Sequence, residues 1–158
     1  MPKGLTLIEL LVILIIVGIL SAISIPIYRD WIKKVGIEND TRSIFSILNE
    51  AKARSFAEKR VCGIIFNGNI IELKCDTNAD DNITDETTII NKIRIKNNFI
   101  KNFSGGVSYI KFSENGTASI IGNIHAADIS TNPSYSCINI SLTRIKIGKW
   151  DGSSCNIK

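Results

Sequence analysis

The sequence predicts an α+β protein in which one long N-terminal helix packs against a small antiparallel β-sheet. Residues 5–25 form a mostly apolar run with a single charge, Glu9. Apolar residues then recur at three- and four-residue steps as far as about Arg60, a pattern typical of an amphipathic helix. Beyond Arg60 the period changes to short strand-like runs separated by turn residues. We therefore expect a membrane-spanning segment at 5–26, an amphipathic helix at 27–60 and a β-rich domain at 61–158.

The apolar segment has the length of a transmembrane helix. At 1.5 Å per residue, residues 5–25 span roughly 30 Å, which is one hydrocarbon thickness. A carboxylate at that depth costs up to roughly 2.5–3.5 kcal/mol, so Glu9 should have a partner or a function. Gly18 and Pro26 weaken the helix, because Pro26 lacks the N–H that would bond to Ala22. We expect a kink or an unwound stretch between Gly18 and Pro26.

The four residues before this segment, Met1 to Gly4, are too few for an ordinary secretory signal peptide. In such signals the small residue at the cleavage site follows the apolar run, whereas Gly4 precedes it. We therefore expect residues 1–4 to be a leader peptide. Cleavage after Gly4 would keep the helix as the N-terminus of the mature chain.

Residues 4–12, GLTLIELLV, followed by Gly18-Ile19-Leu20 and Ile25-Pro26, resemble the class III signal of type IV pilins and pseudopilins. Leu5 stands where that family usually has Phe. The resemblance implies cleavage between Gly4 and Leu5 by a membrane prepilin peptidase, N-methylation of Leu5, and filament assembly through a helix marked by Glu9, Gly18 and Pro26.

Two further stretches resemble the GspH/FimT group of minor pilins. Residues 48–60, LNEAKARSFAEKR, are similar to the end of that group's long helix. Residues 141–150, SLTRIKIGKW, partly match a C-terminal Gly-Arg-x-Arg motif, with Thr143 replacing the glycine and Lys146 the second arginine.

The resemblance implies the type IV pilin fold and a minor pilin or pseudopilin of a type IV pilus or type II secretion system. The implied partners are other pilin subunits, the prepilin peptidase, an inner-membrane assembly platform and the membrane itself. The chain would cross the bacterial inner membrane once, with its C-terminal domain outside the cytoplasm, and later enter a periplasmic or extracellular filament. The alternatives are a DNA-binding minor pilin of a DNA-uptake pilus and a major pilin.

Residues 61–74 read as a β-hairpin around Asn67-Gly68-Asn69. A four-residue loop would place Cys62 opposite Cys75, whereas a two-residue Asn-Gly turn would miss that register by two. Further strands are predicted at Thr88–Ile95, Val107–Phe112, Ala118–Gly122, Cys137–Leu142 and Arg144–Ile147.

The four cysteines suggest two disulfides in an exported domain, and sequence alone allows three pairings. Local geometry favours Cys62 with Cys75 and Cys137 with Cys155. Metal binding is the competing use, but no CxxC spacing is present, and we interpret the single histidine, His125, as a surface loop or strand-end residue.

The C-terminal half of the chain is basic. Residues 87–158 carry nine Lys or Arg against three acids. Arg144 and Lys146 would share a strand face suited to phosphate contacts, with Lys149 nearby and Trp150 able to stack on a base. The alternative is an edge strand that uses charge to prevent aggregation.

Residues 76–86 carry five acids. Asp76, Asn78 and Asp80 match the first ligands of a calcium loop, but Asp81 stands where that loop requires glycine. The alternative is a flexible polar loop. We expect no other cofactor and no enzymatic activity, since no nucleophile–base pair, phosphate loop or paired acid site emerges.

Overall fold

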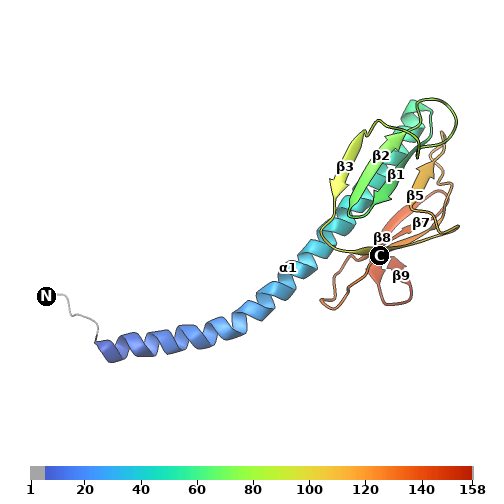
Figure 1. The fold of residues 1–158 in the computed structure, drawn as a ribbon. Coiled ribbons are helices and arrows are strands. Elements are labelled where there is room, and N and C mark those ends of the chain that lie inside the picture. Colours follow the sequence, from blue (N-terminus) through green and yellow to red (C-terminus); the bar gives the residue numbers. More distant parts are fainter. Residues whose placement is uncertain (1–5, 158) are drawn as a thin grey trace.

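The computed structural model describes residues 6–157, and its dominant element is one long helix, α1 (Leu7–Glu58). The C-terminal half of α1 lies against the β-strands, and the N-terminal half extends away from them (Figure 1). Thr6 caps the start of the helix, and Lys59, in the left-handed conformation with φ 51°, ends it.

The helix is continuous through Gly18 and Pro26, so of the two expected outcomes, a kink or an unwound stretch, the unwound stretch is wrong for this structure. Figure 1 shows the axis of α1 curving instead of breaking. The hydroxyls of Ser21 and Ser24 donate to the carbonyls of Val17 and Leu20, at 2.7 and 2.8 Å. Such bonds often accompany a bent helix, and the loss of one donor at Pro26 leaves the neighbouring turns intact.

The strands form two antiparallel sheets, whereas the sequence predicted one. The first sheet has the order β3-β2-β1-β5, with β1 (Cys62–Asn67), β2 (Ile70–Cys75), β3 (Asn91–Arg94) and β5 (Tyr109–Phe112). The second has the order β4-β6-β7-β8-β9, with β4 (Phe99–Phe103), β6 (Gly122–Ala126), β7 (Cys137–Ile140), β8 (Ile145–Trp150) and β9 (Cys155–Ile157).

Several strand boundaries differ from the prediction. The expected strand at Ala118–Gly122 is wrong, because Ala118 makes only an isolated bridge to Phe112 and β6 begins at Gly122. Strands β4 and β9 were not predicted, and Arg144 precedes β8 instead of lying within it. The hairpin of β1 and β2 has the predicted four-residue register, with Cys62 opposite Cys75.

The core lies where both sheets meet the second half of α1. Ile44, Leu48 and Ala51 are fully buried at three- and four-residue spacing, which places them on one side of the helix. They pack in a single cluster with both sheets, including Ile64 and Ile71 of the first and Ile124 and Ile138 of the second. The helix is therefore part of the domain core.

The acidic segment 76–86 contacts the first sheet at Gly63 of β1. A Cβ at Gly63 would lie 2.2 Å from the carbonyl oxygen of Ile110 and 2.6 Å from Cδ1 of Ile83. Ile83 is fully buried, so its side chain anchors the segment in the space that glycine leaves free. The segment is thus fixed to the domain at its centre.

We predict that Gly63→Ala destabilises the protein by about 1–3 kcal/mol, because the added methyl overpacks a space that backbone atoms close. Gly36→Ala is the control, since a Cβ there meets only Nδ2 of Asn97 at 3.4 Å. Removing a glycine from a helix should stabilise by about 0.5–1 kcal/mol. Thermal unfolding of the detergent-solubilised chain measures both, and a Gly63→Ala variant as stable as the wild type would contradict the packing.

Candidate functional site

The start of α1 carries the charge that the sequence singled out. Oε2 of Glu9 accepts hydrogen bonds from the backbone N–H and the hydroxyl of Thr6, both at 2.8 Å. Oγ1 of Thr6 accepts in turn from the N–H of Glu9 at 3.4 Å, which completes a capping box. Sequence reasoning missed the role of Thr6, although the T-x-x-E spacing is its recognised signal. Gly4 and Leu5 lie outside the described residues.

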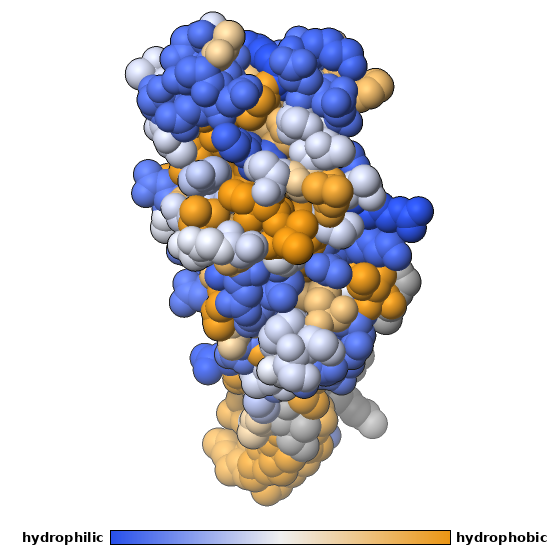
Figure 2. Space-filling view, turned by 90° about the vertical axis from the view of Figure 1, so that its right-hand side faces the viewer, coloured by the Kyte–Doolittle hydropathy of each residue, from blue (hydrophilic) through white to orange (hydrophobic). Residues whose placement is uncertain are grey.

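The first half of α1 has no protein partner in the described chain. Apart from Ile23, its large apolar side chains from Leu7 to Ile25 are exposed by 45–82%. Figure 2 shows this apolar end below a domain whose surface is largely polar. By length and composition alone, α1 is able to cross a membrane. Gly18 lies within this stretch, and a Cβ there would meet nothing within 4 Å.

Two disulfides join the strands of the domain, and they are the two predicted pairs. Cys62 and Cys75 link β1 to β2 directly across the pair. Cys137 and Cys155 link β7 to β9 across β8, whose Gly148 lies opposite Cys137. A Cβ at Gly148 would be 3.2 Å from Sγ of Cys155, so the disulfide passes over glycine.

The second disulfide lies on the outer face of the second sheet, the face turned away from α1. Strand alternation puts Cys137 there together with His125 and Trp150, while Ile138 enters the core. His125 is only 6% exposed and stacks on Trp150, with ring centroids 3.8 Å apart and planes within 7°. His125 is the penultimate residue of β6, which agrees with the strand-end alternative, but it is not a surface loop residue, because Trp150 covers it from two strands away.

The four residues proposed for DNA contact are only partly brought together. Arg144 and Lys146 are exposed, Lys146 on the outer face of β8 and Arg144 in the turn directly before that strand. Lys149 is half-buried and alternates to the opposite face. Trp150 is half-buried with one ring face on His125, so that face is closed to a base. Arg144 and Lys146 are the two that remain together.

The acidic segment is organised around Asp76, which is 4% exposed. The Asp76 carboxylate accepts the N–H groups of Asn78, Ala79 and Asp81, at 2.7–3.0 Å. Asp80 meanwhile accepts the amide of Asn78 at 3.1 Å. The expected ligands Asp76, Asn78 and Asp80 thus bond to the segment itself, and calcium binding stays a prediction.

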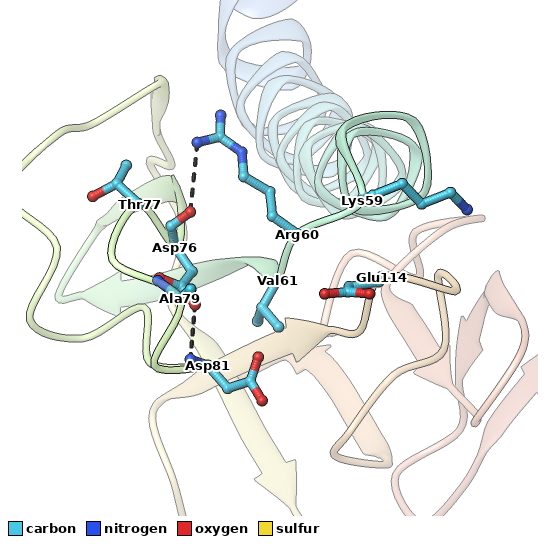
Figure 3. Close-up of a pocket in the computed structure, with 8 residues that line it drawn as sticks. All are labelled: Lys59, Arg60, Val61, Asp76, Thr77, Ala79, Asp81 and Glu114. Atoms are coloured by element: carbon cyan, nitrogen blue, oxygen red, sulfur yellow. Dashed lines mark hydrogen bonds between the residues drawn. The ribbon is translucent and has the colours of Figure 1, made fainter.

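A cavity of about 490 Å³ lies between the end of α1 and this segment (Figure 3). Arg60 enters it from one side and donates to the carbonyl oxygen of Asp76 at 3.5 Å. The carboxylates of Asp81 and Glu114 line it from the other side (Figure 3). The cavity therefore combines both signs of charge.

One group of potential metal ligands lies close together among residues 6–157, Glu58 with Cys62 and Cys75. Both cysteines belong to the first disulfide, so neither offers the thiolate that a metal binds.

Both the N-terminal segment and the fold of this chain resemble those of known proteins. Residues 2–25 match the family described as the prokaryotic N-terminal methylation motif. Two curated relatives from Moraxella bovis, fimbrial protein Q and type IV major alpha-pilin, are each 56% identical over 32 residues. These matches cover 20% of this chain and 20% of each relative, so each concerns one short segment.

The fold has a solved counterpart. The crystal structure of the type IV minor pilin FimU from Pseudomonas aeruginosa superposes with a TM-score of 0.55, covering 74% of this chain and 91% of that one. At 13% sequence identity this likeness concerns the fold. The chain thus combines the prokaryotic N-terminal methylation motif at residues 2–25 with a fold similar to that of a solved type IV minor pilin.

We predict that acidification destabilises the domain through His125. Burial lowers the pKa of this imidazole below its ordinary value of about 6.5. The unfolded chain therefore takes up a proton first, so stability is full above about pH 6.5 and falls as the pH decreases toward the folded pKa.

Thermal unfolding of the detergent-solubilised wild type and a His125→Gln variant at pH 7 and pH 5 provides the test. The variant should lose less stability than the wild type between the two values. Equal losses in the two proteins would contradict the prediction.

Proposed function

We propose that the chain is a minor pilin or pseudopilin of a type IV filament, and that it assembles through the first half of α1. The observation that carries this proposal is an exposed apolar helix half, Leu7 to Ile25, which continues directly into the core of the domain. Apolar surface of this extent is buried in a bilayer or against other subunits. A helix rigidly joined to the domain core would fix the domain's position once it packs with its neighbours.

The Glu9 carboxylate is suited to bind a positively charged group of a neighbouring subunit. Both hydrogen bonds to its carboxylate reach Oε2, and Oε1 has no hydrogen bond among residues 6–157. We propose that the free oxygen accepts the methylated amine of Leu5 from the next subunit, after the prepilin peptidase cuts behind Gly4. The attraction strengthens as assembly excludes water around the pair.

The finer assignment to the GspH/FimT group rests on residues 48–60 and on the partial C-terminal motif at 141–150. Sister pilin subunits and an inner-membrane assembly platform are the partners that this assignment implies. A pilus, a secretion pseudopilus and a major-pilin role share these features, and abundance in sheared filaments separates a major subunit from a minor one.

We predict that Glu9→Ala leaves membrane insertion and cleavage intact but lowers incorporation into filaments by at least about tenfold, the equivalent of about 1.4 kcal/mol. Asp30→Ala is the control, because it removes an acid from the same helix beyond the apolar segment. Immunoblots of sheared filaments, normalised to the cleaved membrane pool, measure incorporation. Normal entry of the Glu9→Ala variant would show that the carboxylate serves another purpose.

DNA binding in an uptake pilus is the second candidate function. The observation that favours it is the exposed pair Arg144 and Lys146 at the start of β8, neither of which forms a salt bridge within residues 6–157. Basic side chains free of ion pairs attract phosphates without sequence preference. Asn139, opposite Lys146 on β7, adds an amide beside them.

If the chain binds DNA there, we predict weak, salt-sensitive retardation of duplex DNA by the detergent-solubilised protein. Arg144→Gln with Lys146→Gln should weaken binding and reduce the salt slope by roughly one per lost contact. The matched control is Lys92→Gln with Arg94→Gln, an exposed pair with the same spacing on β3. No retardation, or equal effects of the two pairs, would leave Arg144 and Lys146 with a role in edge protection.

A further inference from the structure

The segment that joins the apolar half of α1 to the domain, residues 27–34, combines exposed aromatic and basic side chains. Tyr28 is 62% and Trp31 58% exposed, and their rings stack with centroids 6.2 Å apart. Ile32, 48% exposed, completes this face at the three- and four-residue spacing of a helix. Neither the core of the domain nor the capping box accounts for these side chains.

This face points away from the domain. Tyr28 and Ile37 are nine residues apart, which is two and a half helical turns, so they lie on opposite sides of α1. Ile37 is 1% exposed and belongs to the side that the sheets cover. The aromatic pair therefore continues the apolar surface of residues 7–25 without contact with the domain.

Basic side chains lie in the same turns of α1 as the aromatic pair, and Lys33 and the half-buried Lys34 lie toward the side of Ile37. Arg29, Lys33 and Lys34 belong to the same two turns of α1. Lys96, from the loop after β3, lines a cavity of about 240 Å³ together with Lys33 and Asp128. Lys33 donates to the Asp128 carboxylate at 2.5 Å and holds the pKa of that carboxyl well below its usual range.

We define the interfacial collar as Tyr28, Arg29, Trp31, Lys33, Lys34 and Lys96. At the level of the collar its four basic groups outnumber Asp30 and Asp128. Glu38 and Asp40 lie further along α1, where their carboxylates accept the N–H groups of Ser134 and Lys96 in the domain.

The position of the collar matches the surface of a bilayer. From Leu7 to Ile25 the helix rises about 27 Å, close to the roughly 30 Å of a hydrocarbon core. Tyr28 and Trp31 follow about 5 and 9 Å further along the axis, at the level of the lipid headgroups. Tyrosine and tryptophan are enriched at this level, and lysine and arginine reach the phosphates from it.

We propose that the interfacial collar binds the anionic lipid headgroups of the membrane in which the subunit waits before assembly. The proposal rests on the proposed function, in which α1 spans that membrane. The stacked aromatic rings lie among the headgroups and set the depth of the helix. Arg29 and Lys34 contact lipid phosphates, and Lys33 and Lys96 add positive charge at the membrane-facing edge of the domain.

The depth of Trp31 tests this binding. The chain has two tryptophans, so Trp150→Phe leaves Trp31 as the single reporter in the full-length protein. In vesicles of phosphatidylcholine with phosphatidylglycerol, Trp31 emission should be blue-shifted. A quencher placed near the lipid headgroup should reduce the Trp31 emission more than a quencher placed at the end of the lipid acyl chain. Emission typical of water, or blue-shifted emission that neither quencher reduces, as in a contact between subunits, would overturn the proposal.

The charge of the lipid tests the basic side chains. Replacing phosphatidylglycerol with phosphatidylcholine should weaken the headgroup-level quenching of Trp31. Arg29→Gln with Lys34→Gln should abolish this difference, whereas the control pair Lys92→Gln and Arg94→Gln should preserve it. A difference that survives Arg29→Gln with Lys34→Gln, or that is absent in the parent, would overturn the role of the collar charges.

A third variant separates this proposal from the membrane span. Val17→Trp, in a chain that also carries Trp31→Phe and Trp150→Phe, reports from the middle of the apolar segment. Quenching of this tryptophan by the quencher at the acyl-chain end would establish that α1 spans the bilayer. If Trp31 then showed no quenching at the headgroup level, that result would count against the collar alone. No quenching at position 17 would contradict the span and overturn the collar with it.

Discussion

The packing of two β-sheets onto one side of α1 is the interaction on which the rest of the structure depends. Ile44 and Leu48 are fully buried between the sheets, and their cluster includes strands from both. The same helix continues to Leu7 without interruption. The position of its exposed half is therefore coupled to the position of the domain. The disulfides then fix strands whose own contacts are few, such as the three-residue β9.

The exposed half of α1 and the domain need different surroundings. The described apolar side chains of residues 7–22 and 24–25 are exposed, so they need lipid or other subunits to cover them. Thr6 donates two hydrogen bonds to Oε2 of Glu9 at the start of that helix, and Oε1 of Glu9 accepts none within residues 6–157. The stacked Tyr28 and Trp31 mark where the two environments meet.

The sequence was most informative where local chemistry decides the structure. The apolar run, the position of Glu9 and the hairpin register of Cys62 with Cys75 follow from residues close together along the chain. The sequence was least informative where distant strands meet. The division into two sheets depends on which strands pair across long loops, and neither β4 nor β9 has a clear alternating pattern. The burial of His125 depends on Trp150, which lies two strands away and 25 residues later.

We propose that one helix forms both the core of the domain and, once residues 1–4 are removed, the segment that enters a filament. Mass spectrometry of the N-terminal peptide from membrane-derived protein distinguishes the processed chain from the unprocessed one. We predict a chain that begins at Leu5 with a methylated amine. A chain that begins at Met1, or one cut beyond residue 20 so that the apolar helix is lost, would contradict it.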